Sequence, residues 1–168
     1  DLIWAASDNT TIYGNVQLLD STYDSLSLIS DPGRGRFGCA SNGVSGALES
    51  FDCSGQSLLF SPEFGMDLGI NHIINMNNYD LSLTADASYR DEQGTNFLFL
   101  KETIADSYVT LNLEATLSPV NADWALSVYM RNATDERFLM NSNTNNRGLS
   151  YGIFNPPQNY GVRLHANF

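Results

Sequence analysis

The sequence predicts an all-β fold, and more specifically an antiparallel transmembrane β-barrel segment with long external loops. Three observations support this: apolar and polar residues alternate along much of the chain, short turns alternate with long polar linkers, and aromatic residues gather at strand ends. Residues 160–168 show the alternation well, because a strand places alternate side chains on opposite faces. Its two rows are Tyr160, Val162, Leu164, Ala166 and Phe168, against Gly161, Arg163, His165 and Asn167. A lipid-facing strand that ends at a membrane interface also explains the terminal aromatic Phe168.

The same alternation predicts six strands and the end of a seventh. The truncated first segment ends at Trp4, and the six strands cover residues 12–18, 64–71, 79–90, 109–117, 124–131 and 160–168. Short turns are expected at residues 7–10, 75–78 and 118–122. Residues 24–56 and 132–158 are expected to be long polar loops, and a medium loop follows residue 90. Short turns on one side and long loops on the other are typical of outer-membrane barrels.

The aromatic residues agree with two membrane interfaces. Trp4, Tyr79, Trp124 and Phe168 fall at the short-turn ends, and Tyr23, Tyr89, Tyr108 and Tyr160 fall toward the long-loop ends. Two aromatic belts are what lipid interfaces favour, so Trp4, Tyr79, Trp124, Tyr160 and Phe168 are the predicted interface residues. In the alternative, a soluble β-sandwich, we would expect more Lys and Glu on the polar face and no order in the loop lengths.

Composition narrows the partners. The chain has 168 residues, with 8 Lys and Arg against 19 Asp and Glu and a net charge of −11. This acidity argues against nucleic acid, which is bound by clustered Lys and Arg. No apolar run approaches the roughly 20 residues of a membrane helix, but closed barrels also satisfy every backbone group in lipid. The chain opens at Asp1 without an initiator Met or signal peptide, so we expect a processed product or a fragment.

Two cysteines, Cys39 and Cys53, lie within one polar stretch rich in Gly, Ser and Asn. They are expected to form a disulfide that staples the long loop, which implies an oxidising compartment. The alternative is two free thiols in a cytosolic loop. Zinc is not expected, because no second Cys or His pair stands near.

Six or seven strands are too few to close a bacterial barrel, which has an even number of at least eight. An open sheet would expose unpaired backbone edges to lipid, at a cost of several kcal/mol for each group. The sequence therefore predicts that the missing strands come from residues upstream of Asp1.

Four stretches, in their order and spacing, resemble one known family. They are residues 61–64 (Ser-Pro-Glu-Phe), 106–113 (Asp-Ser-Tyr-Val-Thr-Leu-Asn-Leu), 131–138 (Arg-Asn-Ala-Thr-Asp-Glu-Arg-Phe) and 159–168, which ends in Phe168. The first resembles the s-P-x-w start of an earlier strand in TonB-dependent outer-membrane receptors. The second resembles the strand two before the last, the third the late N-L-T-D-x-x-Y stretch, and the fourth the final strand P-R-x-Y-G-v-x-l. The resemblance spans essentially the whole chain.

The resemblance implies a 22-stranded barrel around an N-terminal plug, driven by the inner-membrane TonB complex. Residues 1–168 would be the C-terminal part of the barrel, its last six strands plus the end of the one before, with no plug domain in this chain. The cysteine-bearing loop has counterparts in some members. The departures are Ala133 for the usual Leu, and Pro156-Pro157-Gln158 in place of Pro-Arg; neither disturbs the alternation.

The sequence contains only weak candidates for a catalytic, nucleotide-binding or metal-binding motif. Residues 33–38 match the G-x-G-x-x-G pattern, but Pro32 precedes them and no helix is expected after them, so we interpret them as a flexible loop. His72 and His165 are far apart in sequence, and each is expected to be a satisfied histidine of the polar face rather than a ligand or a base. No catalytic residue, metal site or cofactor is expected, and the protein is not expected to be an enzyme.

Charged residues on the predicted inner face are expected to line the lumen and to pair with a plug and water. They are Asp67, Asp86, Glu114, Arg90, Arg131 and Arg163. The alternative is transient contact with a passing ligand, for which Arg90, Tyr129 and Arg131 are best placed. In the long loops, Arg34, Arg36, Tyr151 and Phe154 are the candidates for ligand contact. The many loop acids are expected to be a solvated surface, with attraction of cations as the alternative; they include Glu102, Asp106, Asp135 and Glu136.

We therefore expect this chain to form part of a transport receptor in the outer membrane of a Gram-negative bacterium. It would bind and import a scarce nutrient, either an iron chelate (siderophore) or a cobalamin- or glycan-like solute, with TonB-transduced energy and without bond chemistry. Its expected partners are the upstream strands and plug of the same receptor, the TonB complex, outer-membrane lipid and the small-molecule ligand. The alternatives are a small complete barrel acting as an anchor or adhesin, and a secreted glycan-binding β-sandwich.

Overall fold

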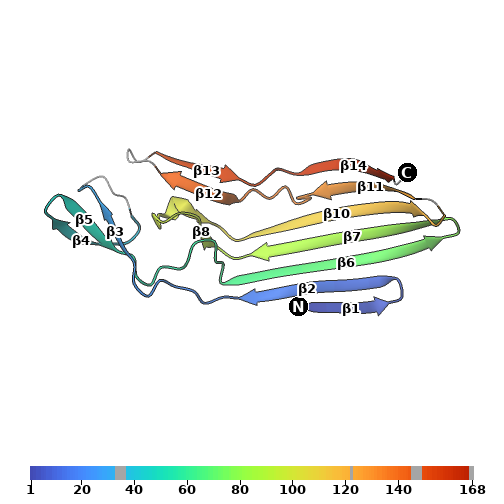
Figure 1. The fold of residues 1–168 in the computed structure, drawn as a ribbon, viewed down its shortest axis with the longest axis horizontal. Helices are drawn as coiled ribbons and strands as arrows, with labels where there is room; N and C mark the ends of the chain where they lie inside the picture. The colour runs from blue at the N-terminus through green and yellow to red at the C-terminus, as the bar shows by residue number, and fades with distance from the viewer. Residues whose placement is uncertain (33–36, 122, 145–148, 167–168) are drawn as a thin grey trace.

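The computed structural model describes residues 1–32, 37–121, 123–144 and 149–166, and it is all-β and antiparallel. One sheet of seven strands dominates it, in the order β1-β2-β6-β7-β10-β11-β14 (Figure 1). The strands are β1 (Leu2–Ser7), β2 (Thr10–Leu18), β6 (Phe64–Met76), β7 (Tyr79–Arg90), β10 (Tyr108–Pro119), β11 (Trp124–Arg131) and β14 (Asn159–Ala166). All of the strands that the alternation predicts are present. β6 runs five residues beyond its predicted end at 71, so the turn before β7 is shorter than expected.

The register explains why the alternation of apolar and polar residues could be recognised in the sequence. Each strand of the large sheet pairs with its neighbour so that apolar residues lie opposite apolar residues. One row crosses every strand, through Trp4, Ile12, Ile70, Ala85, Leu113, Met130 and Tyr160. A slip of one residue in any pair would move a whole set of side chains to the other face. The shared pattern therefore specifies the register across the sheet.

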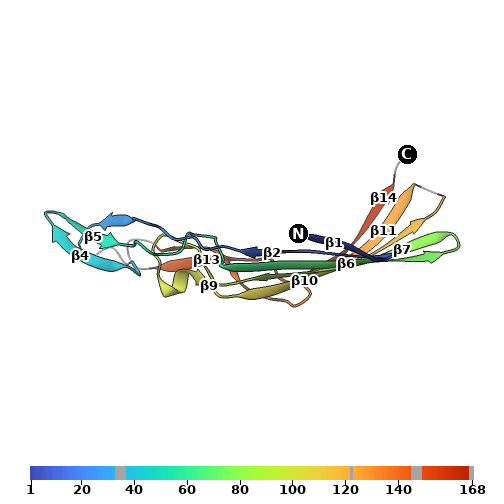
Figure 2. The same ribbon diagram turned by 90° about the horizontal axis from the view of Figure 1, so that it is seen from below.

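The large sheet is a single layer. Seen from the side, no second sheet or helix formed by the described residues lies over either of its faces (Figure 2). Apolar side chains on one face are open, with Val128 53% exposed, Val162 68% and Leu164 69%. The buried apolar residues of the described chain, Phe51, Cys53 and Ala105, all lie outside this sheet. Among the described residues no helix is long and apolar enough to cross a bilayer.

The two ends of the sheet differ as the sequence predicted. The connections β1–β2, β6–β7 and β10–β11 are short and lie at one end, and the long connections lie at the other (Figure 1). At the short-turn end the rings of Tyr79 and Trp124 are 6.4 Å apart. Trp4 and Tyr160 are 56% and 78% exposed. They lie at opposite edges of one paired row, so their positions along the membrane normal depend on the tilt of the strands. Phe168 lies outside the described residues.

The long connections correct the expectation of polar loops. Residues 24–56 hold a three-stranded sheet, here called the distal sheet, of β3 (Ser27–Ser30), β5 (Leu48–Asp52) and β4 (Ala40–Ser45) in that order. Residues 132–158 hold the hairpin β12 (Leu139–Thr144) and β13 (Ser150–Phe154). A third pair, β8 (Gln93–Gly94) and β9 (Ile104–Ala105), flanks the short helix η1 (Lys101–Thr103). Ser, Gly and Asn dilute the apolar alternation in these strands, so the sequence did not reveal them.

The predicted disulfide is confirmed. Cys39 and Cys53 are bonded, with their Cα atoms 5.1 Å apart, and Cys53 is 1% exposed. Beside it the rings of Phe37 and Phe51 lie 4.7 Å apart. Hydrogen bonds from Ser54 hold the pKa of the Asp52 carboxyl below its usual value. The distal sheet thus has a small core and a covalent link of its own.

The two arms that lead to the distal sheet are hydrogen-bonded to each other. Tyr23 donates from its backbone N to Gln56 O at 2.9 Å and accepts from Gly55 N at 2.8 Å. Leu58 N donates to Ser21 O at 3.1 Å, so the chain enters and leaves this segment side by side.

The structure corrects the placement of one histidine. His72 pairs with Thr10 and Leu83, and this puts it on the apolar face of the sheet rather than on the polar face. It is satisfied there, because its Nδ1 lies 2.8 Å from the Thr10 hydroxyl. The parity of β6 requires this placement, since Ile70 and Ile74 share its face. His165, opposite Ala125, lies on the polar face as predicted.

Candidate functional site: the polar face and a pocket at the loop end

The first of the predicted inner-face arginines, Arg90, is fully engaged. Its Nη2 forms an ion pair with Asp67 at 2.9 Å, and its Nη1 donates to the carbonyl oxygens of Tyr89 at 2.7 Å and Met66 at 3.3 Å. Asp67 stands on β6 and Arg90 on β7, where the register brings them to one face. The guanidinium therefore ties two strands together and has little donor capacity left for a solute.

The second cluster crosses β10, β11 and β14. Arg131 forms an ion pair with Glu114 at 2.7 Å, and its guanidinium carbon lies 5.5 Å from the centre of the Tyr129 ring. Arg163 stands 5.4 Å from the same ring and has no carboxylate partner among the described residues. The Tyr129 ring lies over Gly161 on the neighbouring strand, where a Cβ atom would clash with it. Close approach of the ring is thus possible only because residue 161 is glycine.

A similar contact, in which a Tyr ring lies over a Gly of the neighbouring strand, joins β2, β6 and β7. The Tyr13 ring lies across Gly69, where an added Cβ would collide with it, and its hydroxyl donates to Asp86. Tyr13, Gly69 and Asp86 belong to one paired row. The sequence predicted that Asp86 and Glu114 face inward, but it did not identify their partners. Of the residues proposed for a passing ligand, Tyr129 and Arg131 lie together and Arg90 lies apart on β7.

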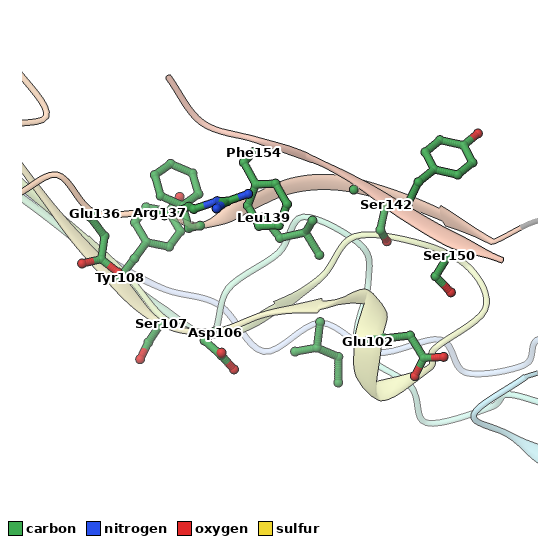
Figure 3. Close-up of a pocket in the computed structure, with 14 residues that line it drawn as sticks. Glu102, Asp106, Ser107, Tyr108, Glu136, Arg137, Leu139, Ser142, Ser150 and Phe154 are labelled. Carbon is green, nitrogen blue, oxygen red and sulfur yellow. The ribbon is translucent and has the colours of Figure 1, made fainter. Parts of the chain in front are cut away.

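A cavity with polar and apolar lining lies at the long-loop end of the sheet, and Figure 3 shows it in close-up. It has a volume of about 360 Å³, within the range of small-molecule sites. Its lining comes from three parts of the chain: residues 102–108 before and at the start of β10, residues 136–142, and residues 150–154. The lining residues are Glu102, Ile104, Asp106, Ser107, Tyr108, Glu136, Arg137, Phe138, Leu139, Ser142, Ser150, Tyr151, Gly152 and Phe154. We call it the loop pocket.

Aromatic contacts shape the loop pocket. The rings of Tyr108 and Phe138 are stacked, with centroids 3.6 Å apart and planes 1° from parallel. The guanidinium of Arg137 lies over the ring of Phe154, with its central carbon 4.2 Å from the ring centre. These two pairs join β10 and β13 to the segment between β11 and β12.

Asn132 holds that segment in place, and it is 7% exposed. Its backbone N donates to Asn112 Oδ1 at 3.0 Å. Its side-chain Nδ2 donates to the carbonyls of Glu136 at 2.9 Å and Pro156 at 3.2 Å. Its Oδ1 accepts from Glu136 N at 3.0 Å. Asn132 has a φ of 50°, a left-handed conformation that Asn adopts more readily than most residues.

The rest of the Asn-Ala-Thr-Asp stretch clasps the chain that returns toward β14. Asp135 Oδ1 accepts from Gln158 N at 3.0 Å, and Gln158 Nε2 donates to Ala133 O at 2.9 Å. Asn155 Oδ1 accepts from Phe138 N at 2.9 Å. Since Ala133 contributes through its backbone here, Ala in place of Leu does not disturb the clasp. The stretch singled out in the sequence is thus the base on which the loop pocket is built.

We expect replacement of Asn132 by Ala to lower the free energy of local opening of the loop pocket by about 2–4 kcal/mol, because the carbonyls of Glu136 and Pro156 lose their donor and Ala is strained at positive φ. Asn132→Gly tolerates the backbone conformation and loses only the side-chain bonds, so its effect should be smaller by about 1 kcal/mol. Hydrogen exchange of peptides covering residues 136–156 measures this, with exchange fastest for Ala, intermediate for Gly and slowest for Asn. Equal exchange for Asn132→Gly and the unaltered protein would contradict the role of the side-chain bonds.

Two of the four loop residues predicted to contact ligand, Tyr151 and Phe154, line the loop pocket. Arg34 and Arg36 lie outside the described residues. Sequence reasoning named Glu102, Asp106 and Glu136 as solvated loop acids, with attraction of cations as the alternative, and it missed Arg137. Glu136, Arg137 and Phe138 directly follow the Asn-Ala-Thr-Asp stretch, and this was the available signal for a site. The sequence did not show that residues 102–108 and 150–154 pack against them.

Other hollows lie on the described surface, and two of them are at the long-loop end and lined in part by carboxylates. A larger hollow of about 560 Å³ lies on the apolar face, where Ala85 and Ala115 are shorter than their neighbours, and its lining is mainly aliphatic. Across the described ranges, no group of three or more His, Cys, Asp or Glu residues is placed to hold a metal ion. No protein-family model, curated protein or solved structure matches the chain.

Proposed function

We propose that this chain forms part of the wall and external loops of an outer-membrane transport receptor of the TonB-dependent kind. In this proposal the apolar face of the large sheet contacts lipid and the polar face lines the interior. The long-loop end with the loop pocket faces the outside and contacts a scarce small-molecule nutrient. The protein performs no bond chemistry; uptake is driven by the TonB complex acting on a plug.

The observation that carries the proposal is the large sheet as a single layer with two unlike faces. Val128, Val162 and Leu164 are open on one face, while Asp67–Arg90 and Glu114–Arg131 are ion pairs on the other. A lipid-facing wall needs this arrangement, because apolar side chains contact acyl chains and charges must be paired or wet. The order of short and long connections supports the same orientation.

The outer edges of β1 and β14 have no partner strand among the described residues. Backbone groups at such an edge are costly in lipid, so the proposal requires further strands to continue the sheet on both sides and close it. The upstream part of the same receptor is the proposed source of these strands and of the plug.

The rival with a specific observation in its favour is a β-sandwich, since an exposed apolar face could pack on a second sheet. The two differ in what covers the apolar face, which is lipid for a barrel wall and a second sheet for a sandwich. Among the described residues no second sheet covers that face. A small complete barrel used as an anchor needs a strand number that the large sheet does not reach among the described residues.

Fractionation of the source cells tests the proposal. An antibody raised against this segment should detect the protein in the outer-membrane fraction, in a band several times larger than 18.5 kDa. The band should migrate faster without boiling than after it, because folded barrels resist detergent. Recovery of the protein in a soluble fraction, with no detergent needed to keep it dispersed, would overturn the proposal and favour the sandwich.

A further inference from the structure

We propose that the loop pocket binds a small zwitterionic ligand of about the size of a dipeptide, with a carboxylate held by Arg137 and an ammonium group held among the surrounding carboxylates. This names the ligand class of the proposed receptor's loop pocket, and its biological meaning rests on the proposed function. The binding itself follows from the chemistry of the pocket and can be measured separately.

Arg137 is prepared to receive an anion. Its guanidinium lies over the Phe154 ring at 4.2 Å, which holds one face of the planar group. Stacking of this kind leaves the N–H donors at the edge of the guanidinium free. Both ion pairs of the described residues involve other arginines, so no described carboxylate occupies these donors. A carboxylate can then bind with two parallel hydrogen bonds, the geometry that a guanidinium favours.

The rest of the pocket disfavours a ligand that carries only negative charge. Glu102, Asp106 and Glu136 also line it, and none of them forms an ion pair among the described residues. Figure 3 shows these carboxylates spread around the pocket rather than gathered at one point. With one guanidinium against three carboxylates, the pocket is negative, and an anion at Arg137 would be repelled by its surroundings. A ligand with a compensating ammonium group removes this repulsion.

Size and remaining contacts agree with a short peptide. The cavity volume of about 360 Å³ lies at the lower end of the range for small-molecule sites. Ser107, Ser150 and Tyr151 carry hydroxyl groups at its edge, which can bond to peptide N–H and C=O groups. The size and lining of the loop pocket therefore fit an amino-acid derivative or a short peptide.

Calorimetric titration of the full-length protein, purified in detergent, tests this with three probes. L-alanyl-L-alanine carries both charges, its N-acetyl form lacks the ammonium group, and its C-terminal amide lacks the carboxylate. We expect saturable binding of the dipeptide, and binding weaker by about tenfold or more for each capped form, as is expected for loss of a charge-assisted hydrogen bond. Equal binding of the three probes, or no saturable binding of the free dipeptide, would overturn the proposal.

Variants then assign the carboxylate to Arg137. Arg137→Gln should weaken dipeptide binding by about tenfold or more and remove the preference for the dipeptide over its amide. Phe154→Leu, which keeps the charge but removes the ring, should weaken that preference in part. Arg163→Gln removes one positive charge from the polar face of the large sheet, outside the pocket lining, and should change binding by less than about twofold. An Arg137→Gln protein that still prefers the free carboxylate would refute the assignment.

The outcomes separate this inference from the proposed function. Dipeptide binding by a protein found in a soluble fraction would keep the ligand class and discard the receptor. A protein of the outer membrane that binds none of the probes would keep the receptor and discard the ligand class.

Discussion

Replacing Val162 by Arg is expected to leave little folded protein in the outer membrane. Val162 is 68% exposed on the apolar face, well inside the ends of β14, and lies opposite Val128. If that face contacts lipid, a guanidinium there costs about 2–4 kcal/mol near the bilayer midplane, and assembly of the last strand is impaired. The measurement is the amount of heat-modifiable protein in purified outer membranes, relative to the unaltered protein expressed at the same level.

His165→Arg is the matched control for this prediction. It places the same group on the same strand, but on the polar face opposite Ala125, where a charge can be hydrated. Its amount in the membrane should stay close to that of the unaltered protein. If Val162→Arg and His165→Arg accumulate equally in the outer membrane, the apolar face does not contact lipid. If both proteins are found in a soluble fraction, the sandwich is favoured instead.

Removal of the disulfide should open the distal sheet while the large sheet stays folded. The Cys39–Cys53 bond links residues 14 apart, and closing a loop of this length is worth about 3 kcal/mol on the chain-entropy estimate. The Cys39→Ser, Cys53→Ser double variant should therefore raise the open fraction of the distal sheet by roughly two orders of magnitude. Cleavage between residues 27 and 52 by a dilute protease, followed by mass spectrometry, measures this.

The hairpin of β12 and β13 is an internal control, because it lies in another loop and contains no cysteine. Its cleavage should not change in the double variant. Unchanged protection of residues 27–52 would mean that the hydrogen bonds of β3, β4 and β5, together with the packing of Phe51, hold the distal sheet without the covalent link.

The strands of the large sheet were predictable because a single layer with two uniform faces repeats one simple pattern. In β7, for example, apolar residues alternate strictly with polar ones: Leu81, Leu83, Ala85 and Ala87 against Asp80, Ser82, Thr84 and Asp86. His72 shows that the position of a residue along a strand, rather than its polarity, determines which face of the sheet it occupies. Its place in β6 determined its face, although the polarity of the side chain suggested the other one.

The distal sheet and the loop pocket were less accessible, for different reasons. The distal sheet is built from short strands rich in Ser, and a disulfide and the packing of Phe51 support their pairing in place of a clear alternation. The loop pocket depends on contacts between distant segments, such as Tyr108 on Phe138 and Arg137 on Phe154. Local patterns name such residues one by one but do not show that they meet.

The paired arms at Tyr23 and Gln56 have a consequence for immunology. Because the chain enters and leaves the distal sheet at adjacent points, the segment from Ser21 to Leu58 can be grafted into a β-hairpin of an unrelated carrier without long linkers. Its disulfide makes it a conformational epitope. If the long-loop end faces the outside of the cell, as proposed, antibodies raised against the oxidised graft should recognise whole cells and lose recognition after reduction.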